Sequence, residues 1–128
     1  MNFERVFSNA PWEGKVGYCR ALKAGNQIYV TGTAPVNEAG NGVHAPGDAY
    51  AQARRCLELI ERALGQFGAT RRNIVRTRMF VTDISQWAEH GRAHAEFFRD
   101  DKPATTMVEV RALIDPAMLI EIEADAVV

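Results

Sequence analysis

The sequence predicts an α+β fold, in which a single sheet carries two helices on its apolar face. The first observation is that segment 102–128 contains two stretches in which apolar and charged side chains alternate, as in half-buried strands. The second is that segments 48–68 and 86–99 carry apolar residues at three- and four-residue steps, as in amphipathic helices. The predicted order is strand, strand, helix, strand, helix, strand, strand, without repeats.

Length and composition define the class of protein. The chain has 128 residues, 47% hydrophobic and 24% charged, which predicts one globular domain over residues 1–128. A formal net charge of -1 gives no overall attraction to nucleic acid or anionic lipid. The chain shows neither a signal-peptide start nor an apolar run near the ~18 residues of a membrane span, so we expect a cytoplasmic protein without a membrane partner. Cys19 and Cys56 lack metal-type spacing and read as small hydrophobic residues.

The N-terminal part predicts strands. Phe3, Val6 and Phe7 indicate an edge strand or a packed arm. Residues 16–23 predict a strand, and the tight turn 24–27 leads into a second strand at 28–31, which makes an antiparallel hairpin. Residues 37–47 are rich in glycine, proline and small polar residues and predict a surface loop.

The first helix begins at Asp48, a good N-cap, and Gly68 is placed to end it. Its apolar stripe comprises Ala49, Ala53, Cys56, Leu57, Ile60, Ala63, Leu64 and Phe67. A strand at 74–82 follows, and Asp83 or Ser85 can cap a second helix at about 86–99. The predicted inward stripe of that helix is Trp87, Gly91, His94, Ala95 and Phe98. A glycine in mid-helix costs about 1 kcal/mol relative to alanine, so Gly91 predicts a close approach by another group.

Two helices cover only one side of such a sheet. The other side is predicted to present Arg76, Arg78, Phe80, Met107, Glu109, Arg111, Glu121 and Glu123. Phe80 and Met107 are apolar for a solvated surface, which favours a symmetric homo-oligomer that sets arginines against glutamates and leaves clefts between subunits. The alternative is a solvent-exposed face with scattered ion pairs.

The chain resembles the Rid (reactive intermediate deaminase) or YjgF-type family over nearly its whole length. The matching pieces are N-A-P at 9–11, G-Y at 17–18, V-T-G-T-A-P-V-N at 30–37, A-Q-A-R at 51–54, I-V-R-T-R-M-F-V-T-D at 74–83, and the closing P-A-T-T-M-V-E-V and L-I-E-I-E-A. The resemblance implies a chorismate-mutase-like fold and a homotrimer whose sheets form a central barrel. It also implies three interfacial clefts that bind a small metabolite, and in one branch hydrolyse enamines and imines to keto acids and ammonia.

By this resemblance, the water-handling carboxylate is Glu121, the site tyrosine is Tyr18, and the strand-end residues are Thr31 and Gly32. Imine hydrolysis needs a substrate anchor and a polar group that places water and manages a proton. Two alternatives stay open. Glu121 can instead pair with Arg78 or Arg111 in the barrel, and Tyr18 can simply pack at an interface.

The chain departs from the deaminating branch at the substrate anchor. That branch reads Pro-Ala-Arg, with an arginine that clamps the substrate carboxylate, whereas Pro103-Ala104 is followed here by Thr105. The next site position, often cysteine in that branch, is Met107, and a site asparagine of that branch aligns with Gly91 on the second helix. Trp87 on the same helix is a further candidate for substrate binding. We therefore predict a substrate other than the simple amino-acid imine.

A replacement cation could come from Arg20. It stands two positions after Tyr18 on the predicted strand, so both side chains should leave the same face. The alternative is an exposed arginine paired with a surface carboxylate.

No cofactor motif is present. His90 and His94 are four residues apart on one helix but lack a third ligand, so we predict no metal site. His94 reads as a core-edge histidine, and His90 as a weak acid-base candidate near the cleft. Two functions follow: hydrolysis of an enamine, imine or similar reactive metabolite, and non-catalytic binding of a metabolite or partner by the trimer. Some family members are described as ribonucleases, but the arginines at 71–78 lack interleaved aromatics, which disfavours an endoribonuclease.

Overall fold

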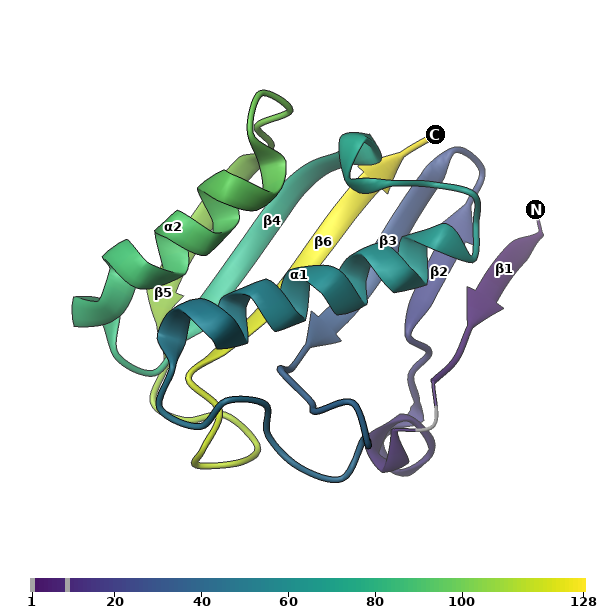
Figure 1. The fold of residues 1–128 in the computed structure, drawn as a ribbon. Coiled ribbons are helices and arrows are strands. Elements are labelled where there is room, and N and C mark those ends of the chain that lie inside the picture. The colour runs from purple at the N-terminus through teal and green to yellow at the C-terminus, as the bar shows by residue number, and fades with distance from the viewer. Residues whose placement is uncertain (1, 9) are drawn as a thin grey trace.

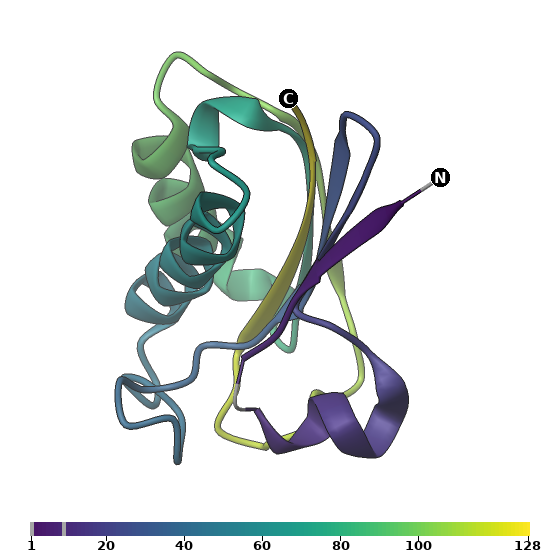
Figure 2. The ribbon, with the colours of Figure 1, turned by 90° about the vertical axis from the view of Figure 1, so that its right-hand side faces the viewer.

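The computed structural model describes residues 2–8 and 10–128. They form one six-stranded sheet with two long helices on one face (Figure 1). Seen along the sheet, both helices lie on one side, and a short helical segment near the N-terminus lies beyond the lower end of the strands (Figure 2). The predicted α+β fold is therefore confirmed.

The sheet has the strand order β1-β2-β3-β6-β4-β5. The strands are β1 Phe3–Val6, β2 Ala21–Ala24, β3 Gln27–Thr33, β4 Ile74–Val81, β5 Ala104–Glu109 and β6 Ile120–Val127. The helices are α1 Ala49–Gly65 and α2 Trp87–Phe98, with a π-helical turn at Glu13–Gly17 and 3₁₀ turns at Arg71–Asn73 and Ile84–Gln86. Only the β4–β5 pair is parallel within this described sheet. The predicted order of the long elements is correct, and β1 is an edge strand, as expected.

Helix α1 packs its predicted stripe against the sheet. Asp48 caps it by accepting a hydrogen bond from Ala51 N at 2.9 Å. The apolar residues predicted for this face are buried, Phe67 only partly. The helix ends at Gly65, and Gly68, predicted as its end, supplies a positive φ of 75° in the turn that follows. No helix in residues 2–8 and 10–128 is long and apolar enough to cross a membrane.

The predicted strand at 16–23 is wrong in its first half. Residues 13–17 form the π-helical turn, which ends at Gly17 with φ of 90°, and β2 begins only at Ala21. A positive φ is readily adopted by glycine and breaks a regular strand. The alternation through Val16 and Tyr18 is therefore not that of a strand, whereas the tight turn into β3 is confirmed.

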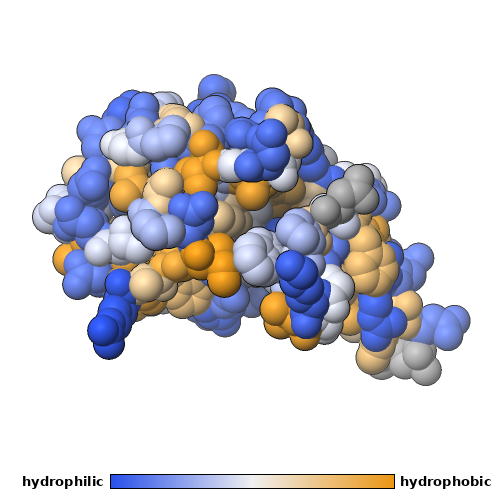
Figure 3. All heavy atoms as spheres, turned by 90° about the horizontal axis from the view of Figure 1, so that it is seen from below, coloured by the Kyte–Doolittle hydropathy of each residue, from blue (hydrophilic) through white to orange (hydrophobic). Residues whose placement is uncertain are grey.

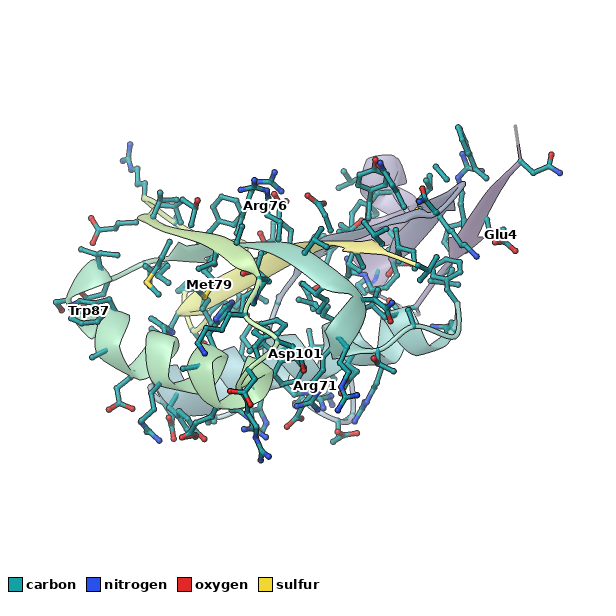
Figure 4. The ribbon with its side chains drawn as sticks, turned by 90° about the horizontal axis from the view of Figure 1, so that it is seen from above. Glu4, Arg71, Arg76, Met79, Trp87 and Asp101 are labelled. Atoms are coloured by element: carbon teal, nitrogen blue, oxygen red, sulfur yellow. The ribbon has the colours of Figure 1, made fainter. Side chains whose placement is uncertain are left out.

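The face assignment of β5 is also wrong. Met107 pairs with Met79 of β4 and packs against the core, and Thr106 and Val108 pair with Arg78 and Phe80 on the bare face. Both sets of alternate residues in β5 contain apolar side chains, so the alternation did not identify the buried set. For β4 the assignment is correct: Arg76 points away from the helices and Met79 toward them (Figure 4).

Two other residues of the predicted bare face belong elsewhere. Glu109 has the side-chain parity of Met107, and its Oε1 accepts a hydrogen bond from Ile84 N at 3.0 Å. Arg111 follows the end of β5. The acidic residues of β6, by contrast, keep their predicted bare side, because the alternate residues of that strand are buried in the core.

The inward stripe of α2 is only partly as predicted, since His94 and Phe98 are buried and Trp87, Gly91 and Ala95 are not. Its buried residues are His90, Ala93, His94, Phe97 and Phe98. Trp87 is 62% exposed and points outward at the start of the helix (Figure 4). A Cβ at Gly91 would have no atom within 4 Å, so the close approach predicted there does not occur within the chain. His90 is fully buried, which removes it as an acid-base candidate at a cleft.

Candidate functional site

A cavity of about 460 Å³ lies where β3 ends and β6 begins. Its lining comes from the N-terminal segment, the end of β3, α1, the connection before β6, and β6 itself. The lining residues are Ser8, Ala10, Trp12, Val16, Tyr18, Arg20, Gly32, Ala34, Val36, Leu59, Arg62, Ala63, Gln66, Ile114, Met118 and Glu121. Seen from below, apolar side chains lie among polar ones on this end of the molecule (Figure 3). A mainly apolar cavity of this size with a few polar groups is typical of a small-molecule site.

A β-bulge places Glu121 in this cavity. Between Val30 and Thr33, strand β3 has one more residue than β6 across the ladder, so Thr31 and Gly32 form the irregularity. A Cβ built at Gly32 would lie 3.1 Å from Cδ and 3.2 Å from Oε2 of Glu121. Glycine is therefore the residue that leaves room for the Glu121 carboxyl. Bulges often re-aim side chains next to active sites in this way.

Burial raises the pKa of the Glu121 carboxyl above its usual value, and nearby Glu123 adds to the rise, while the positive charge of Arg20 opposes it. A carboxylate whose pKa is raised by burial accepts a proton more readily than an ordinary surface carboxylate. Arg78, one of the alternative partners considered for Glu121, lies instead 3.3 Å from both Glu123 and Asp125. Glu121 is thus directed to the cavity rather than to Arg78.

Arg20 reaches the cavity although it precedes strand β2. Its side chain is 15% exposed, and Nη2 donates to the Gly32 carbonyl at 3.1 Å. In the described part of the chain, its Nε is buried without a hydrogen-bond partner, and Oε2 of Glu13 lies 3.9 Å away. The predicted alternative, an exposed arginine paired at the surface, is wrong. A guanidinium with unused donors in a cavity can bind an anionic or carbonyl oxygen.

The turn before β2 positions Tyr18. Its backbone N donates to the carbonyl of Glu13 at 3.0 Å, which closes the π-helical turn and directs the tyrosine to the cavity. The Arg20 guanidinium lies 5.8 Å from the Tyr18 ring centre. Thr31 does not line the cavity; its Oγ1 donates to the Cys19 carbonyl at 2.8 Å and ties the bulge to this turn. Thr31 therefore positions the site from outside.

The other four candidates lie away from this cavity. Thr105 and Met107 are on β5, and Trp87 and Gly91 are on α2, whereas strands β6 and β4 separate β5 from β3. None of the four lines the cavity. Within one chain, the structure brings together Glu121, Tyr18, Arg20 and Gly32, and it leaves the second set on the edge strand β5 and on helix α2.

Sequence reasoning missed Glu13 and the apolar walls of the cavity. Glu13 is 5% exposed, and its carboxylate accepts hydrogen bonds from the backbone N and the hydroxyl of Ser8. It stands in a short turn without periodicity, so no pattern marks it. The wall residues Trp12, Val16 and Ile114 come from irregular segments for the same reason. The described residues contain no group of three or more His, Cys, Asp or Glu side chains that could hold a metal ion.

The site thus joins a mainly apolar cavity, a glutamate of raised pKa and a neighbouring arginine within a small α+β fold. The profile of the family described as "Endoribonuclease L-PSP" matches residues 8–128. The chain belongs to this family, which also carries the names YjgF and Rid. The predicted family is therefore confirmed.

Individual relatives agree with this assignment. A 3-aminoacrylate deaminase RutC from Acinetobacter baylyi is 36% identical over 105 residues, which is 82% of each chain. Among solved structures, a YjgF/YER057c/UK114 family member from Mycobacterium tuberculosis has 46% identity and a TM-score of 0.89, covering 99% of this chain and 100% of that one. The YjgF gene product of E. coli has 33% identity and a TM-score of 0.83, covering 97% and 98%.

Proposed function

We propose that this protein hydrolyses the C–N bond of a small enamine or imine and releases ammonia. The observation that carries the proposal is the Glu121 carboxyl, which is seated on Gly32 and faces the apolar cavity with a raised pKa. The relationship to a 3-aminoacrylate deaminase supports the same type of reaction.

The reaction needs only one proton-transfer group. Water adds to the imine carbon as the Glu121 carboxylate takes one water proton, and the C=N electron pair moves to nitrogen, which receives that proton. In the resulting carbinolamine, Glu121 takes the hydroxyl proton and returns it to nitrogen as the C–N bond breaks. Ammonia and a carbonyl compound leave, and the carboxylate is regenerated. To Tyr18, which lines the same cavity, we assign the role of holding this water.

Arg20 is proposed as the substrate anchor. It supplies charged donors beside Glu121, while Thr105 supplies only a hydroxyl at the other sheet edge. The pair Arg20→Gln and Arg62→Gln tests this role, because Arg62 also lines the cavity but bonds to Glu38. Arg20→Gln should weaken binding of carboxylate ligands far more than that of neutral ones, and Arg62→Gln should change neither. Equal losses for both ligand types in Arg20→Gln would contradict the anchor.

We also propose a homotrimer, in which the edge strand β5 of one copy meets the cavity of the next. Supporting it are the exposed apolar side chains on the uncovered parts of the sheet, among them Tyr29, Val75 and Val108. The arrangement would join the two sets of candidate residues that a single chain keeps apart. Light scattering at micromolar concentration tests it, and a stable monomer would contradict it.

The deciding experiment is ammonia release from freshly generated enamines and imines, with and without a carboxylate. Acceleration over the buffer rate supports a deaminase. The specific observation that favours the non-catalytic alternative is Thr105, whose hydroxyl bonds to Thr77 of its own sheet. Binding of these ligands or their carbonyl products without ammonia release would establish that alternative. If the purified protein cleaves RNA and every cavity variant still does so, an endoribonuclease site outside the cavity is indicated instead.

A further inference from the structure

A chain of three hydrogen-bonding side chains runs from the core to the edge strand β5. Thr77 of β4 and Thr105 of β5 face each other in the parallel register, with their hydroxyl oxygens 2.7 Å apart. The Thr77 oxygen also lies 2.8 Å from Nε2 of His94 on α2. Thr77 is fully buried and His94 is 8% exposed, whereas Thr105 is exposed. The chain therefore ends at Thr105, a residue on the surface of the edge strand.

His94 is held in its neutral form. Burial lowers the pKa of its imidazole to about 4, and its ring packs with its centre 4.6 Å from that of Phe98. A neutral imidazole carries a proton on one nitrogen only, so Nε2 either donates or accepts. His94 therefore has two neutral tautomers, and the direction of its hydrogen bond with Thr77 distinguishes them.

The single proton of the Thr77 hydroxyl couples this choice to Thr105. When Thr77 donates to Thr105, His94 Nε2 must donate to Thr77, and the Thr105 proton points outward. When Thr105 donates to Thr77, the Thr77 proton turns to Nε2, and the lone pairs of Thr105 point outward. The exposed hydroxyl is a donor in the first state and an acceptor in the second, with no net charge in either.

We propose that Thr105, Thr77 and His94 form an adaptive anchor for a neutral polar group, such as an amide, carbonyl or hydroxyl, at the β5 edge. The anchor deepens the proposed function, on which its place in a reaction rests, by defining a second ligand subsite of neutral character. It differs from the cavity in kind, since Arg20 and Glu121 select by charge and Thr105 selects by hydrogen bonding alone.

The coupling is tested by NMR detection of the His94 ring nitrogens in the full-length protein. In the wild type Thr77 donates to Thr105, so Nε2 of His94 should carry the ring proton. Thr105→Ser keeps the hydroxyl and should retain this tautomer. Thr105→Val leaves the Thr77 proton no acceptor but His94 Nε2, so the ring should shift to the Nδ1–H tautomer. The same tautomer in Thr105→Val and Thr105→Ser would overturn the coupling. Thr77→Val removes the hydroxyl that links Thr105 to His94. With this change, the His94 tautomer should no longer depend on the residue at position 105.

The ligand class is tested with acetamide and acetate, followed by the NMR signals of residue 105 and His94. Acetamide should perturb these signals in the wild type and in Thr105→Ser, with about two- to tenfold weaker binding in Thr105→Val. No perturbation by acetamide, equal binding in Thr105→Val, or a preference for acetate would overturn the anchor. Ammonia release distinguishes the two proposals, since it depends on Glu121 and can persist when acetamide fails to bind.

Discussion

The cavity beside Glu121 and the β5 edge around Thr105 contrast in how they hold polar groups. At the cavity, opposite charges on Arg20 and Glu121 are brought into a half-buried apolar space by a bulge and a glycine. At the β5 edge, the neutral hydroxyls of Thr105 and Thr77, on adjacent regular strands, are hydrogen-bonded in a chain to the buried His94.

The contrast shows that the absence of an arginine at position 105 does not by itself define the chemistry of the candidate site. Thr105 lacks the charge of the arginine found in the deaminating branch, but the cavity holds a different arginine in Arg20. Charge is expensive to bury and needs a partner or a ligand, whereas a hydroxyl is satisfied by its neighbours. The following predictions test how far the two regions differ.

The largest effect is expected from Glu121→Gln. Removing the proton-transfer group should lower ammonia release by a factor of about 10²–10⁴. Glu123→Gln, which removes the next outward carboxylate of β6, should retain most of the rate. Comparable losses in the two variants would show that net charge on this face matters more than the position of Glu121.

Ionisation of the Glu121 carboxyl should destabilise the folded protein as the pH rises. Its pKa is raised in the folded state, so the folded state binds the proton more tightly, and stability falls as the pH rises through and above the usual value of 4.5. Glu121→Gln should therefore unfold at a higher temperature than the wild type at pH 7 and lose that advantage toward pH 4. A lower melting temperature at neutral pH would mean that ionised Glu121 stabilises the fold.

Thr105→Arg is expected to convert the neutral edge into a charged one. A charged contact to a carboxylate contributes about 2 to 3 kcal/mol, so activity on a simple amino-acid imine should rise by one to two orders of magnitude. Thr106→Arg, one residue along on the other face of β5, serves as its control. No gain in Thr105→Arg would indicate that the β5 edge does not face the substrate.

Gly32→Ala should disturb the cavity by displacing the carboxyl of Glu121. The added methyl would lie 3.1 Å from the Glu121 Cδ, so the carboxyl must shift, and the rate should fall by about 10- to 100-fold. Gly65→Ala at the end of α1 is the matched control, because no atom lies within 4 Å of its added methyl. Retention of full activity in Gly32→Ala would show that the position of the carboxyl is not critical.

Arg78→Glu probes the bare face. It would place a third negative charge beside Glu123 and Asp125, which now bind Arg78 at 3.3 Å. If the sheets face one another in a trimer, this repulsion should lower the assembled mass measured by light scattering. Arg72→Glu, on the 3₁₀ turn before β4, should leave the mass unchanged.

The sequence by itself determined the fold class, because alternation and helical periodicity report which face of each element is buried. Helix α1, its cap Asp48, the tight turn into β3 and the order of long elements follow directly from such patterns. The motifs also identified the family and marked Glu121, Tyr18 and Gly32. Arg20 was proposed from its spacing after Tyr18, and the fold brings all four residues to one cavity.

Only the tertiary structure decided how those residues meet. The bulge at Thr31 and Gly32 and the π-helical turn before Tyr18 have no repeating pattern, so alternation predicted a strand where the chain turns. On β5, apolar side chains occupy both faces, and pairing with Met79 settled that Met107 is inside. The bonds of Thr77 to Thr105 and to His94 span 28 and 17 residues of sequence. Such contacts depend on how strands and helices pack, which local periodicity does not encode.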